Sequence, residues 1–213
     1  MKRIMCYGDS NTWGYNPENK LRFDENTRWT SLLAKKLGDD YKVIEEGHCG
    51  RTFCFSDPST PTRNSLEHVQ MIMETQMPLD LIIIMLGTND CKKINMASPK
   101  AIARGLRSNL RIMLNPFYYE GMELPKVLVV SPIHIGDNYE AASDTIETFD
   151  SECYEKSKKL APYLKVTADT FNAYFMDASE FAKAGTYDAI HLDAKNHQQL
   201  SEAMYNKVKE ILG

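Results

Sequence analysis

Long apolar stretches, a basic excess and paired cysteine motifs are all missing from this 213-residue sequence. The longest apolar run, 81–86, has the length of a strand, whereas a membrane-spanning helix needs about 20 apolar residues. Lysine and arginine total 25 against 29 aspartate and glutamate residues, which gives a net charge of -4. A nucleic-acid-binding domain would usually be basic. We therefore expect neither a membrane partner nor a nucleic-acid partner.

The five cysteines include no CxxC pair and no other zinc-ligand spacing. No apolar stretch of signal-peptide length follows the first basic residues. Both observations favour a reducing compartment, and we expect a cytoplasmic protein. The glycine-rich nucleotide motifs GxGxxG and GxxxxGK(S/T) are also absent, so we expect no nucleotide cofactor. No repeat, low-complexity tract or linker interrupts the chain, and its length fits a single domain over 1–213.

Strand-like and helix-like segments alternate along the chain. Strands are predicted over 2–7, 41–45, 80–86, 126–131 and 163–168, and helices over 28–37, 64–76, 98–114, 145–160 and 196–212. The unbroken apolar run in 80–86 is typical of a strand that is buried on both faces of a parallel sheet. The alternation predicts an α/β fold, in which a five-stranded parallel sheet lies inside a three-layer α/β/α sandwich.

Small polar clusters follow the predicted strands. GDSN occupies 8–11, GHCG 47–50 and GTND 87–90, and DAIH at 188–191 precedes the last helix. Each cluster alone is also an ordinary turn, because Gly, Asp, Ser and Asn are the commonest turn residues. Ligand sites of parallel sheets lie outside the carboxyl ends of the strands. The ordered set at these ends is therefore the candidate site.

These clusters supply the groups that acyl transfer requires. A serine hydroxyl becomes nucleophilic when a histidine takes its proton, and a carboxylate holds the imidazole in one tautomer. Ser10 is the candidate nucleophile and His191 the candidate base, with Asp188 three residues before it. The developing oxyanion needs fixed donors. The N–H groups of Ser10 and Gly50 and the Asn89 amide can supply them.

Together, GDSN, GHCG, GTND and DAIH resemble in order and spacing the four blocks of the SGNH hydrolases, also called the GDSL esterase/lipase family. The resemblance covers almost the whole chain and implies a flavodoxin-like SGNH hydrolase fold. It also implies a triad of Ser10, Asp188 and His191, with Gly50 and Asn89 as oxyanion donors beside the Ser10 N–H. The stretches EEGHCGRTFCFSDP and PLDLIIIMLGTND are similar to the arylesterase-like branch, whose members are often oligomers, and thus favour a homo-oligomer.

These observations predict a serine esterase that hydrolyses small carboxylic esters, with short-chain acyl, aryl or acetylated-sugar groups, through an acyl-enzyme on Ser10. No metal is expected, because His191, Asp193 and His197 fit no standard ligand spacing. Two alternatives stay open. The acyl acceptor could be an alcohol, a sugar or peroxide, which would make the enzyme an acyltransferase or perhydrolase. The chain could also be a non-catalytic flavodoxin-like binding module.

Four further residues are candidates for the pocket. Asp9, Asn11 and Trp13 surround the candidate nucleophile, and His134 follows the fourth predicted strand. Family members often carry Leu at the position of Asn11. His48 and His68 have no partner in the sequence, and we expect structural or surface roles for them.

The remaining polar residues near the strand ends have predicted structural roles. Asp9 and Asp90 are expected to accept hydrogen bonds from loop N–H groups. Arg51 is expected to brace the loop after the second strand, through a carboxylate. The segments 92–97 and 115–124 match no family pattern and are candidates for the pocket border. The sequence therefore predicts neither the acyl length nor the alcohol of the substrate.

Overall fold

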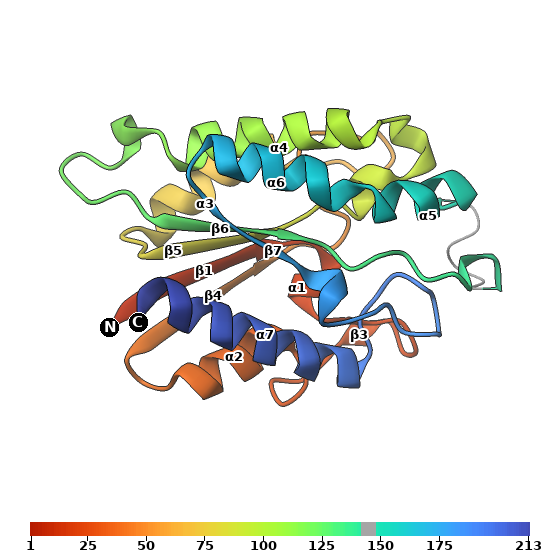
Figure 1. Cartoon of the computed structure of the whole chain (residues 1–213), viewed down its shortest axis with the longest axis horizontal. Helices are drawn as coiled ribbons and strands as arrows, with labels where there is room; N and C mark the ends of the chain where they lie inside the picture. Colours follow the sequence, from red (N-terminus) through yellow and green to blue (C-terminus); the bar gives the residue numbers. More distant parts are fainter. Residues whose placement is uncertain (142–147) are drawn as a thin grey trace.

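Five parallel strands form the central sheet of the computed structural model, which describes residues 1–141 and 148–213. Their order is β4 (Tyr41–Gly47), β1 (Lys2–Gly8), β5 (Leu81–Met85), β6 (Lys126–Ser131) and β7 (Tyr174–Asp177) (Figure 1). All neighbouring strands of this sheet pair in parallel. The predicted five-stranded parallel sheet is thus confirmed.

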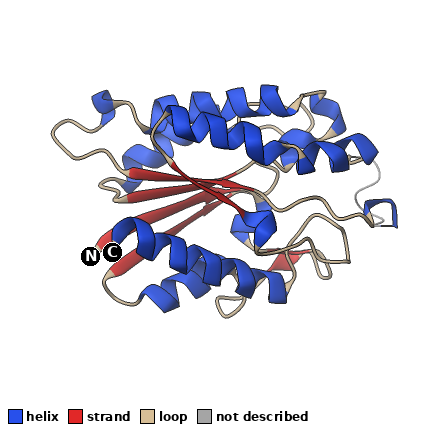
Figure 2. Ribbon diagram, in the orientation of Figure 1, coloured by secondary structure: helices blue, strands red, loops and turns tan. Residues whose placement is uncertain are grey.

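Helices cover both faces of the sheet, as Figure 2 shows. On one face lie α2 (Trp29–Leu37) and α7 (Ala194–Leu212), and on the other lie α3 (Val69–Gln76), α4 (Pro99–Met113), α5 (Ser151–Lys158) and α6 (Leu160–Thr170). All five side chains of β5 are buried, and they alternate between the two cores. A strand covered on both faces has no polar side, which explains its unbroken apolar sequence.

The predicted strand over 163–168 is wrong, because these residues lie within helix α6. Leu160, Leu164 and Ala168 are buried at a spacing of four residues, whereas Tyr163 and Val166 are 44% and 67% exposed. The β-branched residues suggested a strand, but burial follows the helical period. The fifth strand is β7, six residues further along the chain.

Two helices differ from their predicted bounds. The helix predicted over 64–76 is a 3-10 turn, Ser65–Glu67, followed by α3. The helix predicted over 145–160 begins only at Ser151, because the Asp150 carboxylate accepts a hydrogen bond from the Cys153 N–H at 3.0 Å and caps it. Residues 142–147 of that region lie outside the described residues.

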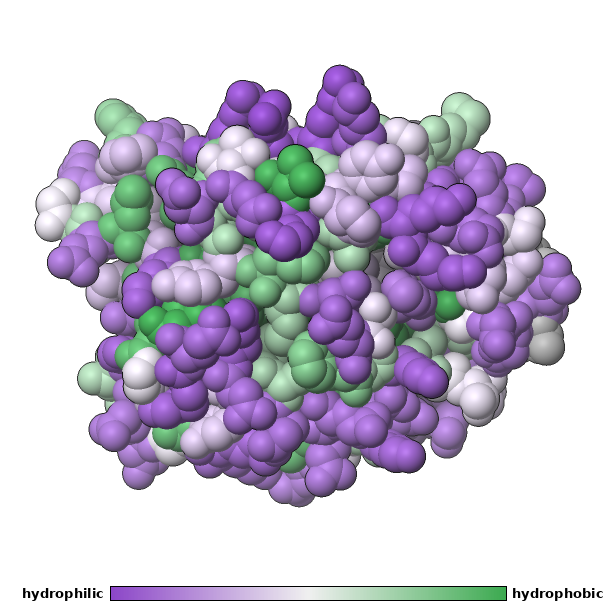
Figure 3. Space-filling view, in the orientation of Figure 1, coloured by the Kyte–Doolittle hydropathy of each residue, from purple (hydrophilic) through white to green (hydrophobic). Residues whose placement is uncertain are grey.

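Short elements complete the fold. They are α1 (Ser10–Trp13), the antiparallel pair β2 (Tyr15–Asn16) and β3 (Leu21–Arg22), and 3-10 turns at Asn89–Cys91, Lys93–Asn95, Pro116–Tyr118, Tyr139–Ala141 and Ala178–Glu180. Within the described ranges, no helix has both the length and the apolar character needed to cross a membrane. In Figure 3, hydrophilic side chains cover most of the outer surface of the helices, and apolar ones gather in the band between the two layers.

Strand register brings the sequence clusters to one edge of the sheet. Gly8 of β1 lies opposite Gly47 of β4 and Met85 of β5, so GDSN, GHCG and GTND all leave the sheet at the same level. The loop before α7, which carries DAIH, reaches the same edge. The segment 115–124 enters β6 from the opposite edge and lines no part of the catalytic cavity described below (Figure 1).

Candidate active site

A tight turn at the end of β1 presents Ser10. Asp9 caps α1, its carboxylate accepting a hydrogen bond from the Asn11 N–H at 2.9 Å, and Ser10 is the first residue of this helix. The helix lies directly against the end of β4, where a Cβ on Gly47 would stand only 2.2 Å from the Trp13 backbone nitrogen. Glycine at this position therefore allows the turn to hold the Ser10 hydroxyl at the edge of the sheet.

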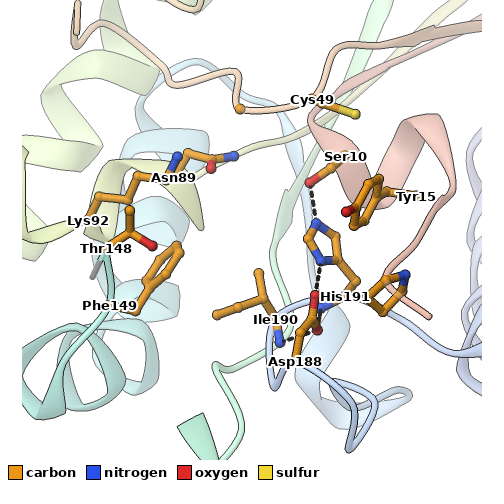
Figure 4. A pocket seen from close by; sticks show the side chains of 12 residues that line it. Ser10, Tyr15, Cys49, Asn89, Lys92, Thr148, Phe149, Asp188, Ile190 and His191 are labelled. Carbon is orange, nitrogen blue, oxygen red and sulfur yellow. Dashed lines mark hydrogen bonds and ion pairs between the residues drawn. The ribbon is translucent and has the colours of Figure 1, made fainter. Parts of the chain in front are cut away.

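The loop before α7 carries a histidine and an aspartate that face Ser10 (Figure 4). His191 Nε2 lies 2.8 Å from Ser10 Oγ, and His191 Nδ1 lies 2.5 Å from Asp188 Oδ2. The second carboxylate oxygen of Asp188 accepts hydrogen bonds from the N–H groups of Ile190 and His191, both at 3.0 Å. The carboxylate thus fixes its own loop as well as the imidazole.

Burial alone would raise the pKa of Asp188, but its hydrogen bonds from the His191 side chain and the loop N–H groups outweigh burial and lower it. Asp188 is therefore ionised near neutral pH and can stabilise a positive charge on His191. The Tyr15 ring packs on the His191 ring, with 4.6 Å between their centroids. Hydrogen bonds and ring packing together restrict the imidazole to one orientation.

Asn11 joins the Ser10 turn to the His191 loop. Its side-chain oxygen accepts a hydrogen bond from the Leu192 N–H at 2.9 Å, and its amide donates to the Ile190 carbonyl at 3.3 Å. Its backbone carbonyl accepts from the Trp29 indole at 3.0 Å. Asn11 thus holds the two halves of the site in register and does not line the cavity. A leucine there could make neither side-chain bond.

The three residues predicted to supply oxyanion donors, Ser10, Gly50 and Asn89, line the same cavity. Gly50 has a φ of +82°, a left-handed conformation that favours glycine, and it lines the cavity. Asn89 donates from its amide nitrogen to the Arg51 carbonyl at 3.2 Å and lies 3.5 Å from Asp9 Oδ2. Among the described residues, the N–H groups of Ser10 and Gly50 have no hydrogen-bond partner. They are thus free to receive an anionic oxygen.

Arg51 braces the loop after β4, and no carboxylate among the described residues pairs with it. Its guanidinium donates to the carbonyls of Gly8, at 2.8 Å, and Glu46, and it lies 4.1 Å from the Tyr7 ring centroid. These carbonyls lie near the ends of β1 and β4, and the Gly8 carbonyl also accepts a hydrogen bond from the His48 N–H at 3.0 Å. One nitrogen of the planar guanidinium has two N–H donors and binds both carbonyls.

Two buried carboxyl groups lie behind the donors. Asp90 Oδ1 accepts a hydrogen bond from the Phe53 N–H at 2.9 Å, as Asp9 does from Asn11, so the predicted loop bonds are present. Burial raises the pKa of Asp9 to about 6, and burial together with the Asp9 charge raises the pKa of Asp90 to about 8. Asp90 is therefore protonated near neutral pH. Its Oδ2 atom has no partner within the described part of the chain.

The Asp90→Asn variant is expected to gain thermal stability over the natural protein as pH rises. The folded state keeps the Asp90 proton up to about pH 8, whereas the unfolded chain releases it near its ordinary pKa of 3.8. Asp90 therefore stabilises the fold fully below pH 3.8, and this contribution is lost as pH rises towards about 8. An asparagine has no such proton to lose.

The measurement is Tm at pH 5.5 and pH 8 for both proteins. The Tm of Asp90→Asn minus the Tm of the natural protein should be larger at pH 8 than at pH 5.5. The exposed Asp169→Asn exchange serves as control and should show the same difference at both pH values. If the Tm difference for Asp90→Asn were the same at both pH values, the raised pKa of Asp90 in the folded state would be contradicted.

A cavity of about 230 Å³ opens over these groups. It is lined by Ser10, Tyr15, Pro17, Cys49, Gly50, Asn89, Lys92, Thr148, Phe149, Asp188, Ile190 and His191. Figure 4 shows Ser10, Tyr15 and His191 on one side and Asn89, Lys92 and Phe149 on the other. Burial raises the pKa of the Cys49 thiol, so it stays protonated and does not compete with Ser10 as a nucleophile.

The stretch 12–17 and the segment 92–97 are candidates for the pocket from sequence, and Tyr15, Pro17 and Lys92 within them line the cavity, whereas the sequence does not indicate Phe149. Tyr15 stands only five residues after Ser10 and Lys92 three after Asn89, so nearness to the motifs was the available signal. Phe149 carries no such signal, because it enters the cavity from the connection between β6 and α5.

Several candidates lie elsewhere. Trp13 is half-buried beside Tyr15 and does not line the cavity. His134 lines a separate hollow with Tyr154 and Lys158. His197 is buried, and its Nδ1 atom accepts a hydrogen bond from the Trp29 N–H at 3.3 Å. Over the described residues, no three His, Cys, Asp or Glu side chains are grouped to hold a metal ion.

Comparisons with known proteins agree with this geometry. The sequence model described as GDSL-like lipase/acylhydrolase matches residues 4–204. Among solved structures, Est24, a carbohydrate acetylesterase from Sinorhizobium meliloti, is 34% identical with a TM-score of 0.91, and each chain covers 100% of the other. The aryl esterase of M. smegmatis is 35% identical with a TM-score of 0.91, again over 100% of both chains.

A search of curated proteins found no match. The family match nevertheless spans nearly the whole chain, and both esterases share its full length at more than 30% identity. The chain therefore belongs to the GDSL-like lipase/acylhydrolase family and is a carboxylic ester hydrolase.

Proposed function

We propose that this enzyme hydrolyses small carboxylic esters through an acyl-enzyme on Ser10. The observation that carries the proposal is the chain of contacts from Ser10 Oγ through His191 to Asp188, which ends at a cavity with oxyanion donors. A nucleophile, a base within hydrogen-bond reach and a carboxylate that orients the base are the parts that acyl transfer requires.

In the first half-reaction, His191 Nε2 takes the proton of Ser10 Oγ as the oxygen attacks the ester carbonyl. The imidazolium that forms lies against the ionised Asp188, which stabilises its charge. The carbonyl oxygen becomes an anion in the space bounded by the N–H groups of Ser10 and Gly50 and the Asn89 amide. His191 then gives its proton to the leaving alcohol, and the acyl group stays on Ser10.

In the second half-reaction, a water molecule takes the place of the alcohol. His191 removes a proton from the water as it attacks the acyl carbonyl, and the same donors stabilise the second oxyanion. Collapse returns the proton to Ser10 Oγ and releases the carboxylic acid. An alcohol in place of water would give a new ester, so the balance between the two acceptors depends on which one reaches His191.

The size of the cavity supports a short acyl group. A volume of about 230 Å³ has to hold the reacting carbonyl together with its substituents. The two similar enzymes described above act on an aryl ester and on acetylated carbohydrate by name, which supports acetyl esters of phenols or sugars as substrates. A second hollow of about 370 Å³ adjoins the other side of His191, next to Tyr187 and Phe23, and offers room for the alcohol.

The test of this proposal is a chain-length series of p-nitrophenyl esters. We expect kcat/KM to fall by about tenfold or more between the butanoate and the octanoate, because the longer chain does not fit the cavity. Acetylated phenol and acetylated xylose should both release acetate. A kcat/KM that rises steadily with chain length would contradict the proposed substrate class.

A further inference from the structure

Lys92 brings a positive charge to the catalytic cavity. It follows the 3-10 turn that carries Asn89, is half-buried and lines the cavity. Its ammonium lies 6.0 Å from the centroid of the Phe149 ring. In Figure 4 it stands with Asn89 and Thr148 on the wall across from His191. No step of the proposed reaction uses this charge.

Lys92 makes no direct contact with a carboxylate in the part of the chain that the structure describes. In the described ranges, no carboxylate comes within 4.0 Å of its ammonium, whereas the neighbouring Lys93 lies 3.7 Å from Asp150. Among the charges that raise the pKa of Lys92, Asp57 has the largest effect, and its carboxylate already accepts hydrogen bonds from Ser59 at 2.8 and 2.6 Å. Burial lowers the pKa of Lys92, and Asp57 and Asp9 act in the opposite direction.

A second cation stands near the same rim. The Arg63 side chain passes 3.4 Å from the position that a Cβ on Gly50 would occupy, and its guanidinium contacts His48. Burial and the Arg63 charge lower the pKa of His48 to about 4, so this histidine is neutral and supplies no negative charge. Among the described residues, neither of the two positive charges at the rim formed by Asn89 and Gly50 is paired with a carboxylate.

The position of Lys92 on the cavity wall determines which part of a bound ester it would contact. The leaving oxygen of the ester must lie at His191 Nε2, which protonates it. The wall with Asn89 and Lys92 lies opposite (Figure 4), so it faces the acyl group. The carboxylate of Asp188, the acidic residue among the lining residues, is directed to His191 and its own loop.

We propose that Lys92 binds a carboxylate at the far end of the acyl group, so that the enzyme prefers monoesters of short dicarboxylic acids over neutral acyl esters of similar length. This inference rests on the proposed ester hydrolysis at Ser10. A carboxylate in this place would gain an ion pair in a partly desolvated site, where charge pairing is worth more than at an open surface.

The test compares phenyl hydrogen succinate with phenyl butanoate, and the spontaneous rate of each ester, including attack by its own carboxylate, is subtracted. For the natural protein, the ratio of kcat/KM for succinate to that for butanoate should exceed one. Lys92→Met keeps the length of the side chain without its charge and should lower this ratio on the order of tenfold, mainly through KM. Lys92→Arg should restore most of the ratio.

Lys93→Met is the matched control, because this exposed neighbour lies outside the cavity, and it should leave the ratio unchanged. A ratio that Lys92→Met does not alter would overturn the proposal. So would an effect of Lys92→Met confined to the ratio of kcat/KM for 4-acetoxybenzoate to that for 4-acetoxybenzamide, since 4-acetoxybenzoate carries its negative charge on the alcohol part and the amide is neutral. Failure of the proposed function is distinguishable, because the natural protein would then release phenol from neither ester.

Discussion

Replacing Ser10 with alanine is expected to lower kcat for p-nitrophenyl acetate by a factor on the order of 10⁴ or more. The substitution removes the oxygen that lies 2.8 Å from His191 Nε2 and leaves the imidazole without a nucleophile to activate. The residual rate would come from the oxyanion donors and from substrate binding alone. The measurement is initial-rate kinetics against the natural protein, with the spontaneous hydrolysis subtracted.

Ser131→Ala is the control for this change. Ser131 is also buried at the carboxyl end of a strand, but it does not line the cavity, so its variant should keep activity close to that of the natural protein. Unchanged melting temperatures would show that both variants are folded. If Ser10→Ala hydrolysed the ester as fast as the natural protein, Ser10 would not be the nucleophile.

The second large effect is expected for Asn89. Asn89→Ala should lower kcat on the order of 100-fold, because it removes the amide donor that we propose for the oxygen that becomes negative only in the transition state. An interaction of that kind raises kcat and leaves KM nearly unchanged. Steady-state kinetics on p-nitrophenyl acetate separates the two parameters.

Asn89→Asp sharpens this experiment, since it keeps the shape of the side chain and replaces the donor with an acceptor. It should lose at least as much kcat as the alanine variant. If Asn89 served only to hold the loop through the Arg51 carbonyl, both variants would lower thermal stability instead. Catalysis by the folded fraction would then stay near the natural rate, which would contradict the oxyanion role.

Much of the architecture could be predicted because burial leaves a clear pattern in the sequence. The apolar run that forms β5 indicates a single structure, a strand buried on both faces, because such a strand has no polar residue. The 163–168 segment is compatible with two structures, a strand and a helix. Its β-branched residues favour a strand, and only the packing of Leu160, Leu164 and Ala168 against the sheet selects the helix.

The residues of the site also fall into two groups, those that the sequence predicts and those that it does not. Ser10, Gly50 and Asn89 stand in compact motifs at strand ends, and parallel pairing of the strands explains why they meet. Asp188 and His191 stand in an equally compact motif, but in the loop before α7. The rest of the cavity comes from connections whose paths the sequence does not determine. Phe149 approaches from the segment after β6, while His134, which directly follows that strand, faces another hollow.

The bracing contacts were equally hard to foresee. Arg51 satisfies backbone carbonyls and lies over an aromatic ring, and these partners carry no charge that a sequence pattern reveals. Asn11 bonds to backbone groups about 180 residues away, so its role becomes visible only when the two loops are seen together. Both residues bond to the chain itself, and neither lines the cavity.

The central claim is that Ser10 carries the acyl group, and labelling with a fluorophosphonate tests it most directly. The reagent phosphorylates a serine that a neighbouring base activates, and peptide mass spectrometry locates the adduct. We predict a single adduct on Ser10, formed in step with the loss of esterase activity and absent from the Ser10→Ala variant. An adduct on any other residue, or full inactivation with Ser10 unmodified, would contradict the mechanism.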